Sequence, residues 1–382
     1  MLITIRSVPL SDSILSAGRA EGFDLVGISG VGDYAELAYF PTWIDEGRAG
    51  DMSYLAARSD SGELKRARLA NVAPWARSVI VCAINYNSAQ PYSTEAPDPT
   101  RGWISRYAWT ETDYHDAILS RLRRFESHIA RLAAEECLES RSWCYVDTGP
   151  LVERIYAKYS GIGWIGKNTC IINQQLGSWL FLGVILTSLD LAPSVPAPDR
   201  CGTCTRCIEA CPTHAFSGPY QLDASRCISY LTIEKRGDIP EDLRAGMGRH
   251  LFGCDICQDV CPWNRRAPVG TASEFTPRPA LINPPLTQIA AMSVEEFRET
   301  FRRSPVKRAR FNGLRRNAAI AMGNSGNLQF TASLERLAQD DDPSVAEHSR
   351  WALEHLKHHA TGPNDHDPQT DPPQPICRTT QG

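Results

Sequence analysis

The chain has 382 residues, of which 42% are hydrophobic and 22% charged, and its formal net charge is −4 at pH 7. This length allows two or three domains, and the small negative charge excludes a protein that binds nucleic acid over its whole surface. No apolar run reaches the roughly eighteen residues of a membrane span, and the first residues lack the pattern of an export signal. We therefore expect a cytoplasmic protein that does not enter a membrane.

The first 195 residues alternate strand-like and helix-like segments. Apolar runs at 23–28, 79–84 and 179–186 are typical of buried strands. Between them, residues 114–132 place apolar side chains at spacings of 4, 3, 4 and 3 residues, which gives a long helix one apolar stripe. Such alternation is typical of an α/β or an α+β domain, and we predict an α+β protein whose N-terminal part, residues 1–195, is an α/β domain.

Residues 196–270 follow a Pro-rich linker and hold eight of the thirteen cysteines, which indicates metal or redox chemistry rather than disulfides. One run reads Cys-x2-Cys-x2-Cys-x3-Cys-Pro; a second reads Cys-x2-Cys-x3-Cys-Pro, with a further cysteine separated from it by 26 residues. In two-cluster ferredoxins the fourth cysteine of each run ligates the other cluster. We therefore predict a ferredoxin-like domain with two [4Fe–4S] clusters. The first is expected on Cys201, Cys204, Cys207 and Cys261, and the second on Cys211, Cys227, Cys254 and Cys257.

Zinc is the competing ion for these cysteines, because Cys-x2-Cys pairs also form structural zinc sites. The x2-x2-x3-Pro spacing favours iron–sulfur clusters over zinc. Four other cysteines lie in apolar runs and are interpreted as small core residues, since free cysteine is commonly buried. They are Cys82, Cys137, Cys144 and Cys170.

Residues 161–168, Gly-Ile-Gly-Trp-Ile-Gly-Lys-Asn, contain a G-x-G-x-x-G pattern and stop one residue short of a P-loop. A helix-like segment precedes them and a strand-like segment follows, which is the reverse of a nucleotide-binding turn. We expect instead a glycine-rich turn whose backbone approaches another flat ligand. Asp147 follows an apolar segment and begins a turn, which suits either catalysis or a turn-forming role.

The chain becomes helical after about residue 283. Residues 283–358 predict two or three short helices, which fit either a HEAT-like repeat or a plain helical cap, and Asp342-Pro343 is typical of a helix start. Residues 302–316 hold seven basic side chains and no acidic one, which fits either a solvated helix face or a contact with a phosphate backbone. Residues 359–382, which include Cys377, have the composition of a disordered tail.

Several separate stretches resemble the epoxyqueuosine reductase family, whose members complete the queuosine base of tRNA. The two ferredoxin-like runs alone are not specific. The order Val-Asp-Thr-Gly-Pro, then Gly-Ile-Gly-Trp-Ile-Gly-Lys-Asn, then Gly-Cys-Asp-Ile-Cys-Gln-Asp-Val-Cys-Pro-Trp-Asn is highly specific, and the resemblance covers roughly residues 10–357. The stretches that carry it are residues 43–55, 106–107 with 113–115, 146–154, 161–168, 226–237 and 252–264.

The resemblance implies a cobalamin cofactor beside the two clusters, an N-terminal domain like that of reductive dehalogenases, and a HEAT-like C-terminal domain. By the matching motifs, Asp147 is the proton donor beside the corrin and Arg66 contacts cobalamin, while Ser229 and Asp255 are further corrin neighbours. The D-x-H-x-x-G cobalamin-ligand motif is absent. His115 is therefore interpreted as a core or turn residue, which is compatible with the family.

The reaction that the resemblance implies is the reduction of epoxyqueuosine to queuosine in the anticodon loop of tRNA. An external low-potential donor would supply two electrons, and Asp147 would protonate the leaving oxygen, with a pKa raised by burial beside the corrin. Lys307, Arg308 and Arg310 are expected to hold tRNA phosphates. We expect a monomer, because no coiled coil or evident interface segment occurs.

Two other classes of protein compete with this interpretation. A respiratory reductive dehalogenase shares cobalamin and two clusters, but it carries a twin-arginine signal and has no use for a basic helical C-terminal region. A ferredoxin-like electron-transfer subunit is the non-enzymatic alternative. It would need neither the Val-Asp-Thr-Gly-Pro stretch nor the long N-terminal domain.

Overall fold

The computed structural model describes residues 8–361 of the chain. At one end lies a four-stranded sheet in the order β1-β2-β7-β4, in which all neighbours are antiparallel. Long antiparallel ladders join the central strands: the whole of β2 is paired with β7, from Ser78 opposite Thr187 to Asn85 opposite Leu180. The four strands are β1 Leu25–Gly30, β2 Ser78–Asn85, β4 Ser142–Tyr145 and β7 Leu180–Thr187.

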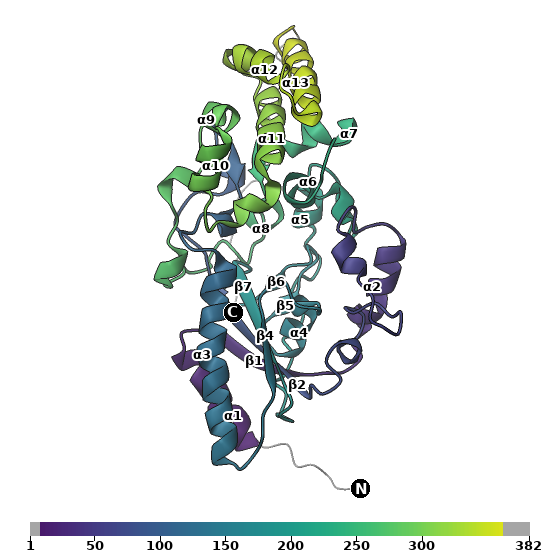
Figure 1. The fold of residues 1–382 in the computed structure, drawn as a ribbon, viewed down its shortest axis with the longest axis vertical. Coiled ribbons are helices and arrows are strands. Elements are labelled where there is room, and N and C mark those ends of the chain that lie inside the picture. The colour runs from purple at the N-terminus through teal and green to yellow at the C-terminus, as the bar shows by residue number, and fades with distance from the viewer. Residues whose placement is uncertain (1–7, 362–382) are drawn as a thin grey trace, which may run out of the picture.

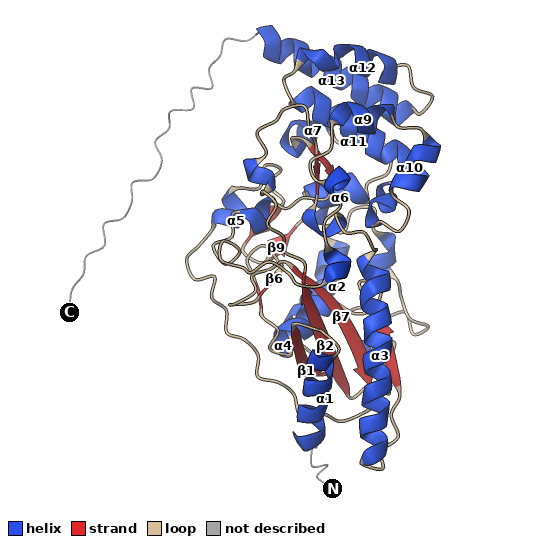
Figure 2. Cartoon of the chain, turned by 90° about the vertical axis from the view of Figure 1, so that its left-hand side faces the viewer, coloured by secondary structure: helices blue, strands red, loops and turns tan. Residues whose placement is uncertain are grey.

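Helices cover both faces of this sheet (Figures 1 and 2). Along β2, Ile80, Cys82 and Ile84 join the core beneath α1 and α3. The alternate residues, Val79 and Val81 among them, join the core beneath α4. This period-two alternation with both faces buried explains why β2 is apolar at nearly every position. The covering helices are α1 Val8–Ala20, α3 Tyr114–Glu135 and α4 Glu153–Tyr159, and α2 Ala35–Asp45 lies farther along the second face.

The predicted strands and the long helix are confirmed, and the structure is a mixture of helices and sheet. The prediction of an α/β N-terminal domain is wrong in one respect, because the sheet is antiparallel throughout and the domain is therefore α+β. Continuous apolar runs are typical of parallel strands because both faces of such sheets are covered. Here helices cover both faces of an antiparallel sheet, so the same pattern arises with the opposite pairing.

Short elements dominate the region of the cysteine motifs, which lies between the sheet and the C-terminal helices (Figure 1). A parallel pairing of β10 with β3 connects this region to a segment far earlier in the chain. The elements are β3 Trp103–Ile104, β5 Trp164–Ile165, β6 Ile171–Ile172, α5 Arg206–Glu209, β8 Phe216–Gly218, β9 Gln221–Leu222, α6 Ile228–Ile233, α7 Glu241–Arg244, β10 His250–Phe252 and α8 Ile256–Asp259.

The C-terminal part is helical, and α11 packs against α13. Asp342 caps α13 as expected, since its Oδ1 accepts hydrogen bonds from the backbone N–H groups of Ser344 (3.1 Å) and Val345 (3.0 Å). Helix α13 continues to Thr361, beyond the predicted start of a tail at 359; residues 362–382, with Cys377, lie outside the described residues. The helices are α9 Leu286–Ala291, α10 Val294–Thr300, α11 Phe311–Asn324, α12 Thr331–Leu337 and α13 Pro343–Thr361.

These helices share one hydrophobic core with earlier segments. Trp103, Trp109 and Phe252 belong to the same buried cluster as Leu314 and Val345. The boundary predicted near residue 283 therefore does not separate two independent cores. Over residues 8–361, no helix has the length and apolar character that crossing a membrane requires.

Candidate redox and proton-transfer site

Eight of the cysteine thiols lie in two groups of four. In the first group, burial and the neighbouring thiols of Cys201 and Cys204 raise the pKa of Cys207 to about 11. Burial, followed by Cys207 and Cys201 among the nearby thiols, likewise raises the pKa of Cys261 to about 11. Cys261 thus joins the three thiols of the earlier run, although 53 residues separate it from Cys207, the nearest of them in sequence. We call this set, Cys201, Cys204, Cys207 and Cys261, the first tetrad.

The second group draws its members from both motifs. Burial and then the thiols of Cys227 and Cys211 raise the pKa of Cys254 well above its usual value. A hydrogen bond with Cys170, burial, and then the thiols of Cys254 and Cys227 raise the pKa of Cys257 well above its usual value. Four converging sulfur donors are the donor set that a [4Fe–4S] cluster requires, so each group fits one cluster. We call this set, Cys211, Cys227, Cys254 and Cys257, the second tetrad.

The glycine-rich motif at 161–168 forms the β5–β6 hairpin, which lies against both tetrads. Trp164 Nε1 donates to Cys201 Sγ at 3.4 Å. Lys167 Nζ donates to the carbonyl oxygens of Gly202 at 2.6 Å and Cys204 at 3.0 Å, and Asn168 Nδ2 donates to Cys257 O at 3.2 Å. The motif therefore holds the cysteine loops in place.

At Gly161 and Gly163 the chain's own backbone comes close, while the expected approach of this motif to a flat ligand stays a prediction. A Cβ at Gly163 would collide with the carbonyl of Ile172 across the hairpin. Gly161 has φ +78°, and a Cβ there would lie 2.5 Å from Val195 O. Both glycines are needed because the chain's own backbone passes close by.

The four cysteines interpreted as core residues have different surroundings. Cys82 is fully buried in the central strand β2, as expected, and Cys144 is half-buried. Cys137, by contrast, is exposed. Cys170 lies at the second tetrad, where a side-chain hydrogen bond with Cys257 lowers the pKa of Cys170 to about 7. Position in an apolar run does not reveal that β6 passes beside the cysteine loops.

Asp147 lies at the centre of a cluster of titratable side chains. Its backbone has φ +58°, rare for a non-glycine residue, and its N–H donates to Glu153 Oε1 at 2.8 Å. Tyr114 donates its hydroxyl to Asp147 Oδ2 at 3.1 Å, and His115 Nε2 lies 3.7 Å from the same oxygen. On its other side, His115 Nδ1 lies 2.7 Å from Asp113 Oδ1.

This arrangement places the proton on the histidine. Burial alone would lower the pKa of His115, but its bonds to Asp113 and Asp147 raise it to about 9. The bond to His115 in turn lowers the pKa of Asp147 below its usual value. Burial and the Asp147 charge raise the pKa of Glu153 to about 8. At neutral pH the cluster therefore contains an imidazolium beside an ionised Asp147.

The side-chain hydrogen bond with His115 lowers the pKa of Asp147, while the rise expected from burial beside the corrin stays a prediction. One interpretation of the sequence is corrected here. His115 is not merely a core or turn residue, since it contacts the predicted proton donor. The sequence contains the Asp-Tyr-His motif at 113–115, but only the fold shows that the start of α3 lies beside the turn after β4.

Arg66 lies beside the Asp147 turn, and Ser229 lies beside the second tetrad. Arg66 donates to Gly149 O, in the Asp147 turn, at 3.0 Å and to Tyr54 O at 2.9 Å. Ser229 makes backbone and side-chain hydrogen bonds with the Cys227 thiol. The ring of Tyr54, 43% exposed, has the Arg66 guanidinium 5.9 Å from its centroid. An exposed ring beside a guanidinium fits a large flat ligand that carries amide and phosphate groups, as cobalamin does.

Asp255 does not fit the predicted role of a corrin neighbour. It is 1% exposed, and its Oδ2 accepts from Trp103 Nε1 at 2.9 Å and from the Arg106 backbone N–H at 2.8 Å. Ser105 donates its hydroxyl to the other oxygen. The buried carboxylate is thus fully used in joining the second cysteine motif to β3 and the segment that follows it.

The basic segment 302–316 is not one surface. Arg316 is 2% exposed and donates to carbonyl oxygens of the α6 region, including Leu231 O at 2.9 Å. Arg315 forms an ion pair with Asp340. Lys307, Arg308 and Arg310 are exposed, although Arg308 also pairs with Glu234. The predicted phosphate contact is thereby reduced to the part of the segment that precedes α11.

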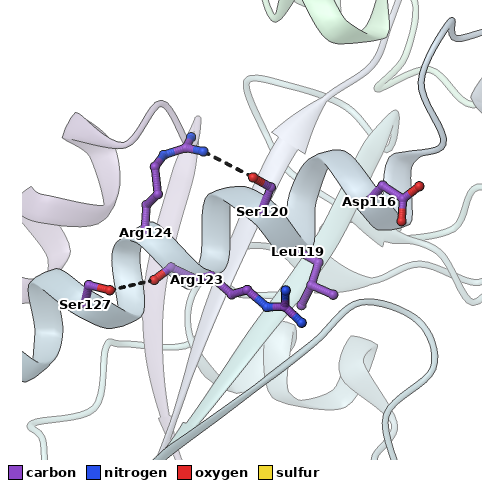
Figure 3. Close-up of a pocket in the computed structure, with 6 residues that line it drawn as sticks. All are labelled: Asp116, Leu119, Ser120, Arg123, Arg124 and Ser127. Carbon is purple, nitrogen blue, oxygen red and sulfur yellow. Dashed lines mark hydrogen bonds between the residues drawn. The ribbon is translucent and has the colours of Figure 1, made fainter.

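A shallow hollow on the outer side of α3 is unrelated to these groups (Figure 3). Arg124 Nη1 donates to Ser120 Oγ at 3.4 Å, and Ser127 Oγ donates to Arg123 O at 3.1 Å. All six lining residues belong to α3 alone, so no second element closes over a ligand. They are Asp116, Leu119, Ser120, Arg123, Arg124 and Ser127.

Comparisons with known proteins agree with this geometry. Residues 200–264 match the family model of the 4Fe-4S double cluster binding domain, and residues 66–148 match the model "Epoxyqueuosine reductase QueG, DUF1730". Epoxyqueuosine reductase of Xanthomonas campestris pv. campestris is 38% identical over 345 residues, which are 89% of this chain and 94% of that protein. The chain belongs to the epoxyqueuosine reductase family. The Pseudomonas aeruginosa enzyme is 39% identical over 352 residues, 90% of this chain and 94% of that one.

Solved epoxyqueuosine reductase structures have the same fold. The Streptococcus thermophilus structure superposes with a TM-score of 0.78 at 28% identity, and covers 91% of this chain and 90% of that chain. A crystal structure of epoxyqueuosine reductase with an epoxyqueuosine-modified tRNA-Tyr stem loop gives a TM-score of 0.78 at 29% identity, with the same coverage. A catabolic reductive dehalogenase reaches a TM-score of only 0.40 at 17% identity, too low to support the expected likeness to that class.

Proposed function

We propose that this protein reduces epoxyqueuosine to queuosine in the anticodon loop of a tRNA. Two electrons and two protons enter, the epoxide oxygen leaves as water, and a carbon–carbon double bond forms in the cyclopentane ring. The family supports this reaction, since relatives at 38–39% identity bear this name and a family member has been crystallised with a modified tRNA stem loop. The observation that carries the proposal is His115 held against Asp147 in a chain that also gathers eight cysteine thiols into two groups of four.

The first and second tetrads hold one [4Fe–4S] cluster each in this proposal. Arg66, which contacts the Asp147 turn, and Ser229, which contacts the Cys227 thiol, would hold cobalamin together with the exposed ring of Tyr54. When bound, the clusters supply single electrons at low potential and the cobalamin supplies a reducing centre for the epoxide. The electrons come from an external low-potential donor, and a cytoplasmic location keeps the thiols reduced.

The Asp147 cluster supplies the proton. An alkoxide released from the epoxide is far more basic than water at neutral pH, so an acid must lie next to it. His115 carries a proton up to about pH 9 and can pass it through Asp147 Oδ2, its neighbour at 3.7 Å. The Tyr114 hydroxyl donates a hydrogen bond to the same oxygen and holds it in place. Asp147 thus remains the proton donor to the substrate, with His115 as the group that recharges it.

The exposed side chains of Lys307, Arg308 and Arg310 bind the phosphates of the anticodon stem loop. They precede α11, and the Arg308 guanidinium lies 5.3 Å from the centroid of the Tyr54 ring on the proposed cofactor surface. A base splayed out of the loop would therefore enter next to the phosphates that these residues hold.

Replacing Asp147 tests the proton transfer. Asp147→Asn should lower turnover by about 10²–10⁴-fold, because a general acid contributes roughly that factor. Iron content and corrinoid uptake should stay at wild-type values, since the variant keeps the shape of the turn. Asp116→Asn, an exposed carboxylate on α3, is the matched control and should retain activity. Normal turnover of Asp147→Asn would exclude Asp147 as the proton donor.

Binding of a tRNA anticodon stem loop at several salt concentrations tests the basic residues. Lys307→Ala with Arg310→Ala should weaken binding and flatten the dependence of log K on log salt, by roughly 0.7 for each single-strand phosphate that the variant no longer binds. Arg131→Ala, an exposed change near the far end of α3, should leave the slope unaltered. If the double variant keeps the wild-type slope, these residues do not bind phosphates.

A further inference from the structure

The indole of Trp164 lies in an unusual place for a buried side chain. It is 2% exposed, and its N–H donates to a sulfur, Cys201 Sγ, at 3.4 Å. Trp263 closes the other side of the ring, with centroids 5.1 Å apart and planes at 78°. The indole end of the N–H···S bond is therefore buried, while Cys201 is half-buried, and a hydrogen bond to a charged acceptor is stronger in such surroundings than in water.

Other hydrogen bonds of the cysteine loop support a role for the bond from Trp164 to Cys201. The backbone N–H of Cys201 donates to Asp199 Oδ1 at 2.7 Å, so the cysteine's own amide is engaged elsewhere. Lys167, three residues after Trp164 on the same hairpin, places its ammonium on the carbonyls of Gly202 and Cys204. One short hairpin thus brings an N–H donor and a positive charge to the first tetrad.

We propose that Trp164 raises the reduction potential of the cluster on the first tetrad through its N–H bond to Cys201. The inference rests on the cluster ligation proposed above. When that cluster takes up one electron from the external donor, no bond breaks and no proton moves, but the thiolate sulfurs become more negative. A fixed N–H dipole stabilises the reduced form more than the oxidised form, and hydrogen bonds to the sulfurs are among the determinants of cluster potential.

The test compares two tryptophan variants. Trp164→Phe keeps an aromatic ring but removes the N–H, whereas Trp263→Phe changes the ring that packs against it and leaves the N–H···S bond in place. Both variants and the wild type are prepared anaerobically and titrated with dithionite and mediator dyes, with the reduced clusters followed by electron paramagnetic resonance. Trp164→Phe should lower one of the two midpoint potentials and leave the other unchanged, and Trp263→Phe should leave both unchanged.

Three results would overturn the inference: wild-type potentials in Trp164→Phe, an equal fall of both potentials in that variant, or the same fall in Trp263→Phe. The last two would point to a general change in burial or solvent access. Iron analysis separates this failure from failure of the proposed function. A wild-type protein without about eight irons per chain would refute the cluster ligation itself, whereas full iron with unmoved potentials would refute only the role of Trp164.

A second measurement needs no variant and covers the case in which Trp164→Phe loses its cluster. Wild-type protein labelled with ¹⁵N in its indole rings is reduced, and its cluster signal is examined by electron–nuclear double resonance. The N–H···S bond should give a ¹⁵N coupling together with a proton coupling that disappears after exchange into D₂O. A reduced cluster with neither coupling would show that the indole does not contact its sulfur.

Discussion

Asp147 shows how strongly one neighbour decides the protonation of a side chain. A carboxyl group packed beside an apolar cofactor would have a raised pKa, but His115 lowers the pKa of Asp147 in this protein. The imidazole lies between two carboxylates, and its pKa rises to about 9. In the proposed reaction, the proton is therefore held on His115 and delivered by the neighbouring Asp147.

The pH dependence of turnover follows from this pairing. His115 stays protonated until the pH approaches 9, so turnover should fall on the basic side through about that value. Asp113→Asn removes one of the two carboxylates and should bring the pKa of His115 down toward 6.5, which moves the basic limb to lower pH. Steady-state rates from pH 6 to about 10 measure the limb. A limb at the same pH in Asp113→Asn would contradict the assignment.

The same shift has a consequence for stability. The folded-state pKa of His115 lies above the ordinary value of 6.5. The pair therefore stabilises the fold fully below pH 6.5, and this contribution is lost as the pH rises through about 9. It is small, because a third of the imidazole is exposed and solvent screens the charges.

At the scale of elements, the β5–β6 hairpin connects the sheet domain to the cysteine loops. Its residues act on both tetrads, through Trp164 and Lys167 on the first and Asn168 on the second. The G-x-G-x-x-G pattern is misleading here because glycine serves two different needs: close approach to a phosphate, and close approach of two stretches of backbone. A phosphate-binding turn opens a helix, whereas strand β6 follows Gly166, so the second need applies here.

Gly163→Ala tests this hairpin. The added Cβ would collide with the backbone carbonyl of Ile172, so the hairpin must open, at a cost of about 1–3 kcal/mol. We expect fewer irons per chain and a lower Tm, measured by iron analysis and thermal unfolding. Gly218→Ala is the matched control, because a Cβ there meets nothing within 4 Å, and it should keep wild-type iron. Full iron in Gly163→Ala would show that the hairpin does not hold the cysteine loops.

At the scale of the whole molecule, three expected domains share their interiors. Asn317 of α11 donates to the carbonyls of Thr232 at 2.9 Å and Leu251 at 2.8 Å, which belong to the cysteine-rich region. Arg316 binds neighbouring carbonyls. Arg316 belongs to the basic segment expected to contact tRNA, but it hydrogen-bonds α11 to the cysteine-rich region instead. Buried carbonyls require such donors.

Truncation tests the shared core. A chain that ends at residue 282 lacks α9–α13 and would expose Trp103, Trp109 and Phe252. It should aggregate or lose its clusters, as judged by size-exclusion chromatography and iron content, because an apolar face of this size needs a cover. A chain that ends at residue 361 keeps every described element and should behave as wild type. A soluble, cluster-loaded 1–282 chain would show that the domains are independent.

Local spacing along the chain was enough to predict three of the four strands of the sheet, the long helix α3, the cysteine runs and the family. Hydrophobic periodicity and motif spacing are properties of neighbouring residues, so one chain reveals them. The antiparallel pairing, the approach of His115 to Asp147, the bond from Trp164 to Cys201 and the burial of Arg316 became visible only in the folded molecule. Each of these joins segments distant in sequence, and no local pattern records which distant segments meet.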